Sequence, residues 1–361
     1  MIRVNNANGK SHLEAGKPVN LKMLAGYLGL SIAAVSRILN GSPAAKSIPQ
    51  DVQDRVFKAA KDLGYTPNVF ARSLRSKRSY TIGIMVAEVS EGYATLVLSG
   101  IEEQLLKEGY FYFVVSHRNR KDLMKEYSRM LMGRAVEGLV AVGTMLAEAL
   151  PIPTVAISGH DEPEGVTNVL LDHNRAASLA MGHLAELGHK KIAFLKGQTH
   201  VTDTNPRWDG IVNAARALNL QIDNNLVVQL VGDDPTPEPG YQATRSLIAS
   251  GADFTALFAF NDMSAIGAMS ALREAGRRIP QDVSVVGFDD ILTASFLNPG
   301  LTTVRQPLKK MGTLAAQTVL RQIQFPNDPL HAARQLVVEP EFIIRGSTGP
   351  CPISSSGKRN K

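Results

Sequence analysis

The sequence contains a single cysteine, Cys351, among its 361 residues. The chain therefore has no internal disulfide and no cysteine-rich zinc module, which suits a reducing compartment. It also lacks an apolar run long enough to cross a bilayer and, near its beginning, the apolar segment of a signal peptide. These absences predict a cytoplasmic protein that has no membrane as a partner.

Charge is distributed unevenly along the chain. Residues 1–80 hold 13 Lys and Arg against 4 Asp and Glu, whereas residues 81–361 hold 26 against 29. Clustered cations favour binding to a polyanion, because they release counterions from its phosphates. A solvated basic face has the same composition, so charge alone leaves both interpretations open.

Three short helical patterns follow one another between residues 20 and 66. Asn20 and Ser31 can cap helices over 21–28 and 32–39, and a third helix starts near Pro49. Two helices joined by a tight turn and braced by a third are typical of a helix-turn-helix, whose second helix enters the major groove of DNA. The alternative is a small three-helix bundle that has only a packing role and does not bind DNA. Four side chains of the second helix are expected to face outward: Ile32, Ala33, Ser36 and Arg37.

From residue 81 onward, short apolar strands alternate with helices. Buried strands separated by helices indicate doubly wound parallel sheets. Because about 265 residues exceed one such sheet, we expect two lobes, with a ligand in the cleft at the carboxyl ends of their strands. The expected strands cover 81–86, 111–115, 138–142, 153–157, 191–195, 256–260 and 283–287.

Catalytic motifs are missing from this pattern. The first strand is not followed by Gly-x-Gly-x-x-Gly, and neither His-Glu-x-x-His nor Gly-x-Ser-x-Gly occurs. No cysteine or carboxylate has the spacing to complete a metal site with His183 and His189. We therefore expect no enzyme, no catalytic residue, no cofactor and no metal. The alternative class is a periplasmic-type sugar-binding protein without DNA binding, which would lack the basic first segment.

Several motifs resemble the lactose/galactose-repressor (LacI/GalR) family of bacterial transcription factors. The first is VNLKMLAGYLGLSIAAVSRILNG, and HLAELGHKKIAFLKG, AFNDMSAIGAMSALREAGRRIPQDVSVVGFDDI and PGLTTVRQPLKKMG follow in the same order. The resemblance covers about residues 20–346. It implies a λ-repressor-like helix-turn-helix head and a periplasmic-binding-protein-like effector domain of two parallel-sheet lobes. It also implies a homodimer, most often a repressor, that binds a pseudo-palindromic double-stranded DNA operator under the allosteric control of a small molecule.

The same resemblance divides the chain into parts. These are a flexible extension 1–19, a DNA-binding domain 20–66, a hinge 67–79, an effector-binding and dimerisation domain 80–346, and a disordered tail 347–361. Within the effector domain, the N-lobe takes about 80–173 and 305–336, and the C-lobe about 174–304 and 337–346.

Carried over by motif, DNA-binding positions fall in the second helix and in the hinge. Arg37 can form two hydrogen bonds with guanine, while Ile32 and Ala33 offer only apolar contacts. Ser36 and Asn40 can equally well cap or end the helix. Leu74 matches the leucine that enters the minor groove at the operator centre. The full set is Ser31, Ile32, Ala33, Ser36, Arg37, Asn40, Asn68, Leu74 and Arg75.

Effector-binding positions carried over in this way suit a hydroxyl-rich ligand, because guanidinium, carboxamide and carboxylate groups can each bond neighbouring hydroxyls. A sugar or sugar derivative is the first expectation and a nucleoside or purine the second. Asn261 and Asp289 have helix capping as their alternative role, and Trp208 has core packing. Glu91-Gly92-Tyr93-Ala94 departs from the family's usual aromatic sequence, so the identity of the effector does not transfer. The matched positions are Tyr93, Ser158, Arg207, Asn261 and Asp289, and Trp208 joins the set because it follows Arg207 and its ring could stack on a ligand.

Overall fold

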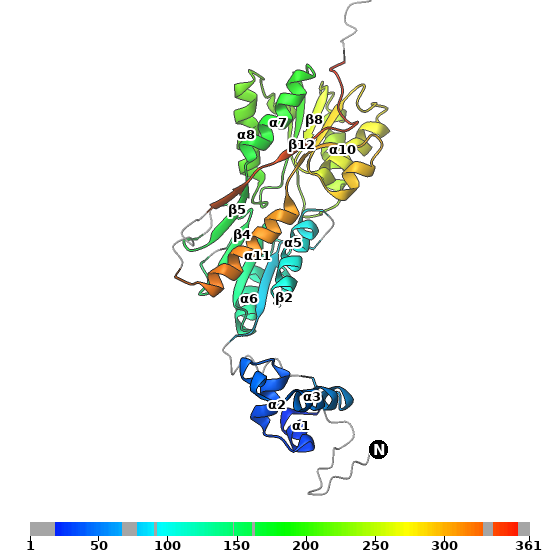
Figure 1. Cartoon of the computed structure of the whole chain (residues 1–361). Coiled ribbons are helices and arrows are strands. Elements are labelled where there is room, and N and C mark those ends of the chain that lie inside the picture. Colours follow the sequence, from blue (N-terminus) through cyan, green and yellow to red (C-terminus); the bar gives the residue numbers. More distant parts are fainter. Residues whose placement is uncertain are drawn as a thin grey trace, which may run out of the picture. The chain divides into compact units, whose positions relative to one another are not determined.

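The computed structural model describes residues 19–66, 78–89, 92–146, 148–160, 163–327 and 335–352. The chain divides into two units, Met1–Ser79 and Tyr80–Lys361 (Figure 1). The expected N-terminal extension up to residue 18, the hinge positions Asn68, Leu74 and Arg75, and residues 353–361 lie outside the described residues.

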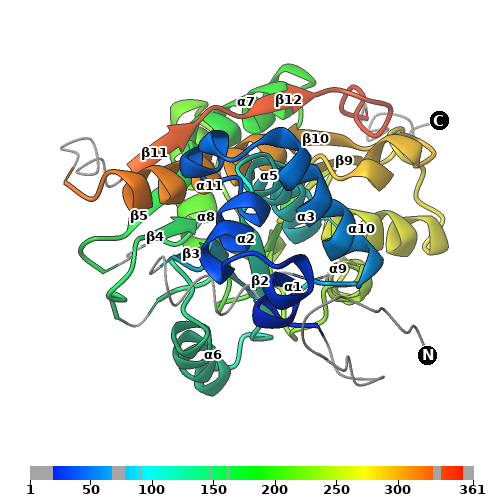
Figure 2. The ribbon, with the colours of Figure 1, turned by 60° about the horizontal axis from the view of Figure 1, so that its bottom comes forward.

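The described part of the first unit is a cluster of short helices: α1 (Leu21–Leu28), α2 (Ile32–Leu39), the 3-10 helix η1 (Pro43–Ser47) and α3 (Gln50–Asp62). The helices α1, α2 and α3 all contact one another (Figure 2). Asn20 and Ser31 cap the first two helices by accepting hydrogen bonds from backbone N–H groups. No single described helix is long and apolar enough to span a membrane; α1 and α2 meet that test only as a pair bent by 108°.

The N-lobe of the second unit has six parallel strands in the order β11-β5-β4-β3-β1-β2. One face carries α5 and α11, and the other carries α6. Unlike the buried strands that the sequence predicts, β2 forms an edge and leaves Phe111 62% exposed. The elements are β1 (Thr81–Val86), α5 (Tyr93–Lys107), β2 (Phe111–Ser116), α6 (Lys121–Gly133), β3 (Gly138–Val142), β4 (Thr154–Ile157), β5 (Thr167–Leu171), α11 (Leu308–Gln324) and β11 (Gln335–Val338).

The C-lobe repeats this arrangement in the order β12-β10-β9-β8-β6-β7, with β12 antiparallel to β10. The pair α7 and α8 covers one face of the sheet and the pair α9 and α10 the other. Its elements are α7 (His173–Glu186), β6 (Ile192–Lys196), α8 (Thr204–Ala217), η2 (Asn224–Leu226), β7 (Val227–Gln229), α9 (Glu238–Ala249), β8 (Ala256–Ala259), α10 (Asp262–Glu274), β9 (Ser284–Asp289), η3 (Leu292–Phe296), β10 (Thr302–Arg305) and β12 (Glu341–Ile343).

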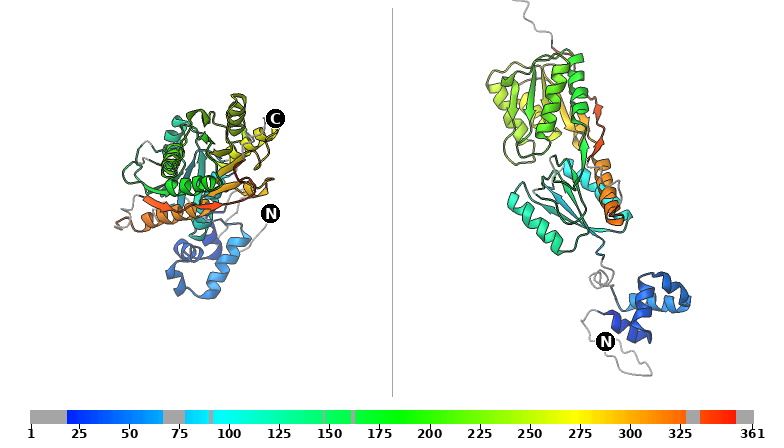
Figure 3. Two further views of the ribbon diagram at one scale, coloured as in Figure 1. Left: turned by 90° about the horizontal axis from the view of Figure 1, so that it is seen from above. Right: turned by 90° about the vertical axis from the view of Figure 1, so that its left-hand side faces the viewer.

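The chain passes between the two lobes three times (Figure 3). It crosses from β5 to α7, returns from β10 to α11, and crosses again from β11 to β12. The carboxyl ends of the parallel strands of both sheets line a shared cleft, which is where open α/β folds bind their ligands.

The segment after β12 is packed against the C-lobe. The buried Ser347 donates a hydrogen bond to the carbonyl of Val285 over 2.6 Å. Further on, the N–H of Cys351 donates to the carbonyl of Leu187 over 2.8 Å. The expectation that disorder begins at residue 347 is therefore wrong for 347–352, because these polar groups have partners inside the lobe.

Candidate functional sites

The outer face of α2 presents the side chains expected to read DNA. Ser31, Ile32, Ala33 and Arg37 are all exposed, and Ile32, although apolar, is 47% exposed. Ala33 and Arg37 are four residues apart and therefore neighbours on the helix surface. None of the described residues forms a hydrogen bond or ion pair with the Arg37 guanidinium, so none of them competes with an outside acceptor for this forked donor.

Ser36 does not belong to this face. It is only 4% exposed, and its carbonyl and hydroxyl oxygens accept hydrogen bonds from Nδ2 of Asn40 at 2.7 and 3.2 Å. The outward orientation expected for Ser36 is therefore wrong: α2 contacts α1, α3 and η1, so it buries more than one narrow stripe. The structure gives Asn40 the role of ending the helix.

In the second unit, a cavity of about 200 Å³ lies between the two lobes. Its walls come from the carboxyl ends of β1, β3 and β4 on one side and of β6, β8 and β9 on the other. Five of the six expected effector-binding residues line this one cavity: Tyr93, Ser158, Arg207, Asn261 and Asp289.

Trp208 does not line the cavity. Its indole packs edge-on against Phe194 with ring centroids 5.6 Å apart, and Lys196 Nζ lies 5.5 Å from the ring centroid. Successive residues of a helix point about 100° apart, so α8 can turn Arg207 toward the cavity only by turning Trp208 toward β6. Trp208 therefore belongs to the packing between helix and sheet, and its placement at the effector is wrong.

Arg207 is the best-held group of the cavity. Its side chain is buried, and Cζ lies 4.4 Å from the ring centroid of Phe260 and 3.6 Å from that of Phe288. Nη1 donates to the carbonyl of Phe260, and Nη2 lies 3.5 Å from Oδ2 of Asp203. Because two aromatic faces and a carboxylate fix the guanidinium, it is positioned before any ligand arrives.

Asp289 ends β9 in a strained backbone conformation, with φ of 116°. Its Oδ1 accepts a hydrogen bond of 2.6 Å from Gln306. Burial raises the pKa of Asp289 to about 7, although Arg207 and Gln306 act in the opposite direction. Ser158, at the end of β4, also has a positive φ, of 55°. Strain of this kind collects at binding sites, where the surrounding structure holds it in place.

Asn261 and Tyr93 have structural partners while they line the cavity. Oδ1 of Asn261 caps α10 by accepting from the N–H of Ser264 at 2.9 Å. The hydroxyl of Tyr93 shares a 2.9 Å hydrogen bond with Ser158 Oγ, and burial raises its pKa. Capping and cavity lining are therefore not exclusive for Asn261, because its carboxamide nitrogen is not used by the cap.

Sequence reasoning missed most of the acidic groups in the wall. Asp203 stands four residues before Arg207, and that spacing at a helix start could have revealed the pair. The others lie on loops that only the fold brings together. The carboxylates that line the cavity are Glu88, Asp203, Asp233, Asp234 and Asp289.

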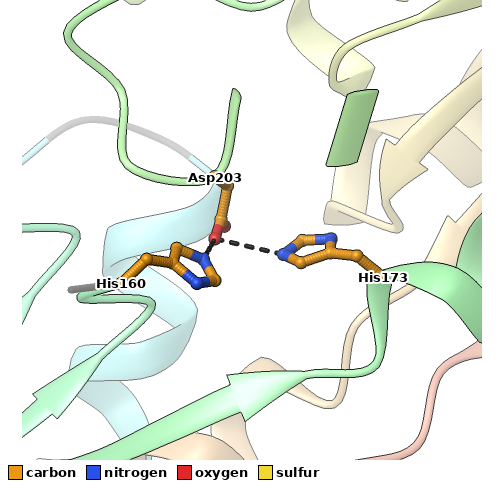
Figure 4. A group of neighbouring side chains, drawn as sticks. All are labelled: His160, His173 and Asp203. Carbon is orange, nitrogen blue, oxygen red and sulfur yellow. Dashed lines mark hydrogen bonds and ion pairs between the residues drawn. The ribbon is translucent and has the colours of Figure 1, made fainter. Parts of the chain in front are cut away.

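Asp203 also joins two histidines that the sequence did not single out (Figure 4). Its Oδ1 lies 2.7 Å from Nε2 of His160 and 3.2 Å from Nε2 of His173. Burial alone would raise the pKa of Asp203, but His173, His160 and Arg207 together hold it well below its usual range. Asp203 is therefore an ionised group at the centre of a buried polar cluster.

A helix-turn-helix unit combined with a two-lobed domain around a polar cavity defines a class: regulators that bind DNA and sense a small molecule. Residues 20–68 match the family of bacterial regulatory proteins of the lacI type, and residues 181–348 match the periplasmic binding protein-like domain. The HTH-type transcriptional repressor PurR of Haemophilus influenzae is 31% identical over 336 residues, which cover 91% of this chain and 98% of that protein. The chain belongs to the LacI family of DNA-binding transcriptional repressors.

Solved structures agree with this assignment. The lac repressor dimer bound to operator and the anti-inducer ONPF superposes with a TM-score of 0.83 at 25% identity, over 92% of this chain and 100% of that one. The complex of the transcriptional regulator CelR with cellobiose has a TM-score of 0.68 at 28% identity, over 91% of this chain and 99% of that one. The predicted fold class and the predicted DNA-binding function are confirmed.

Proposed function

We propose that this chain acts as a homodimer on a two-fold symmetric operator and that a neutral sugar bound between its lobes controls its affinity for that operator. The observation that carries the proposal is the cavity itself, where Arg207, Asp289 and Asn261 meet from three separate elements of the C-lobe. The lac repressor structure supports the dimer, and the CelR structure supports a sugar.

For DNA, the proposal assigns base contacts to the exposed face of α2. Arg37 can donate two parallel hydrogen bonds to guanine O6 and N7, while Ile32 and Ala33 can contact a thymine methyl. Ser31 and Asn40, at the two ends of α2, are proposed to contact phosphates. The hinge positions Asn68, Leu74 and Arg75 are proposed to bind near the operator centre, with Leu74 in the minor groove.

For the effector, the balance of charge in the wall favours a neutral ligand. Five carboxylates line the cavity, whereas Arg207 is the only Lys or Arg of its described lining. A phosphate group would enter beside an excess of negative charge and would lose binding energy to repulsion. Neighbouring hydroxyls of a sugar can instead donate to the Asp289 carboxylate and accept from the Arg207 guanidinium.

A purine or nucleoside is the second candidate, and one observation favours it. Tyr93 and Phe260 both line the cavity, and an aromatic ring there offers a surface for stacking a base. One face of Phe260 is occupied by Arg207, however, so the stacking surface is smaller than two free rings would give.

A thermal-shift screen of the full chain tests the effector. The panel pairs neutral mono- and disaccharides with their phosphates and adds purine bases and nucleosides. We expect at least one neutral sugar to raise the melting temperature and its phosphate to do less. Calorimetry with that sugar should show loss of binding in Asp289→Ala and normal binding in Trp208→Phe, whose ring lies outside the cavity. Stabilisation by purines alone would move the assignment to the second candidate.

Selection of DNA ligands from a random library tests the operator. The recovered site should be two-fold symmetric. Binding of the effector should change the protein's affinity for the operator by some factor, and binding of the operator should change the protein's affinity for the effector by the same factor. Recovery of sites without symmetry would reject the dimeric operator complex.

A further inference from the structure

In the cluster of His160, His173 and Asp203, the carboxylate also holds Arg207, but the proposed function gives the two histidines no task (Figure 4). The three side chains each offer one donor atom, and these atoms all lie within 4.8 Å of one another. His173 and Asp203 are buried, and the His160 side chain is 18% exposed.

The three donors come from both lobes. His160 follows β4 in the N-lobe, whereas His173 begins α7 and Asp203 precedes α8 in the C-lobe. We propose that the cluster binds one first-row transition-metal cation such as Zn²⁺, with His160 from one lobe and His173 and Asp203 from the other as its ligands. Bound there, the metal ties the two lobes together next to the effector cavity, whose wall includes Asp203.

The donor types fit such an ion, and small shifts of the side chains would bring all three donor atoms, now within 4.8 Å of one another, to the spacing that it needs. Two imidazole nitrogens and a carboxylate oxygen are ligands that zinc and its neighbours accept, with a fourth tetrahedral position left for water. Bonds of about 2.0–2.1 Å to a tetrahedral ion place donor atoms about 3.3 Å apart. The His173–Asp203 separation of 3.2 Å meets this value, whereas the His160–Asp203 separation of 2.7 Å must lengthen.

The imidazole rings of His160 and His173 can stay neutral both with and without the metal. In the metal-free cluster, the Nε2–H groups of the two histidines can donate to Oδ1 of Asp203. Metal binding needs these Nε2 lone pairs, so the proton of each ring moves to Nδ1. Nδ1 of His173 is buried and has no hydrogen-bond partner among the described residues, so moving the proton there breaks no existing bond and forms no new one.

The nearby charges allow a cation. Arg207 Nη2 lies 3.5 Å from the other oxygen of Asp203 and opposes the ion. Glu88, Asp233, Asp234 and Asp289 line the same cavity as Asp203, so carboxyl groups outnumber cationic side chains in its described lining. This arrangement differs from His183 and His189, whose rings bond to Thr348, Thr255, Ser284 and the carbonyl of Gly349.

Cobalt titration of the untagged full chain, after chelator treatment, tests the site. We expect one equivalent of Co²⁺ per chain to develop visible d–d absorption and Zn²⁺ to displace it. His160→Gln and His173→Gln keep a side-chain N–H for Asp203 but remove an imidazole, and each should lower the affinity about tenfold or more. His200→Gln is the matched control, because His200 lines the cavity but lies outside the cluster. This variant should bind Co²⁺ as tightly as the native chain does.

Three results would overturn the proposal: no uptake of Co²⁺ or Zn²⁺ by the native chain, unchanged binding in the two cluster variants, or loss of binding in His200→Gln. Circular dichroism checks that each variant is folded. If the buried His173→Gln does not fold, the more exposed His160→Gln decides the result. The sugar screen, run on metal-free protein, tests the proposed function separately.

Discussion

Arg37 and Arg207 show how differently the two units hold a cation that we propose to bind a ligand. Arg37 projects from α2 into solvent, and no described residue pairs with its guanidinium. Arg207 is 4% exposed and is held by Phe260, Phe288 and Asp203. Among the described residues, the first arginine is left for an outside partner, whereas the second is already part of the folded structure.

Because the two arginines differ in burial, their removal should affect ligand binding and folding stability to different extents. An exposed arginine contributes little to folding, so its removal should be felt only in the complex. A buried arginine beside a carboxylate contributes to both, because its removal takes away the permanent positive charge that partners the carboxylate. A preordered side chain also loses less conformational entropy when the ligand binds. Substitutions in each unit test whether this division between them holds.

The largest effect is expected for Arg207→Met. The variant leaves the buried carboxylate of Asp203 without its guanidinium, which should cost about 3–5 kcal/mol of the free energy of unfolding and abolish effector binding. Urea denaturation followed by the fluorescence of Trp208, the only tryptophan, reports on the second unit. Arg216→Met, an exposed arginine of the same helix, is the control and should change stability by less than about 0.5 kcal/mol.

Leu24→Ala probes the first unit in the same way. Leu24 is fully buried in the small core of α1, α2 and α3. Its truncation should cost about 2–5 kcal/mol, which is enough to unfold a unit of this size. Electrophoretic shift assays should then show loss of operator binding, while the Trp208 transition stays where it is. Gln50→Ala, at an exposed position of α3, should leave both unchanged; a shifted Trp208 transition in Leu24→Ala would show that the units fold together.

The first unit could be predicted from sequence because its rules are local. Caps at Asn20 and Ser31 and apolar spacing within eight or thirteen residues set each helix. Ser36 escaped prediction because its burial depends on three neighbouring elements, which the spacing within α2 does not record.

The cavity could be predicted only where family motifs supplied residues. Its walls come from the ends of six strands, so the distances between Ser158, Arg207 and Asp289 are set by the packing of two lobes. No periodicity records that packing. Asp203 and its histidine partners were missed for this reason, and Trp208 was misplaced because two residues that are neighbours in the sequence of a helix point their side chains in different directions.

Asp289→Asn should change the stability of the second unit in a way that depends on pH, and the first unit should show no such change. Burial raises the pKa of Asp289 to about 7, so between pH 4 and 7 the folded state keeps a proton that the unfolded state has lost. Stability conferred by this group is therefore present at low pH and is lost as the pH rises toward 7. Asparagine does not ionise, so the variant should melt a few degrees above the native chain at pH 8 and close to it at pH 4. An equal difference at both pH values would show that Asp289 does not titrate in this range.

The smallest effect on free energy, and the most selective, is expected for Arg37→Ala. Because the side chain has no described partner, the melting curves of both units should be unchanged. Operator affinity should fall by about 1–3 kcal/mol, and discrimination should relax at one base pair in each half-site. Arg55→Ala removes an exposed arginine of α3 as the control and should leave base preference intact. Equal losses on operator and random DNA would make Arg37 a phosphate contact, since only a base contact distinguishes one sequence from another.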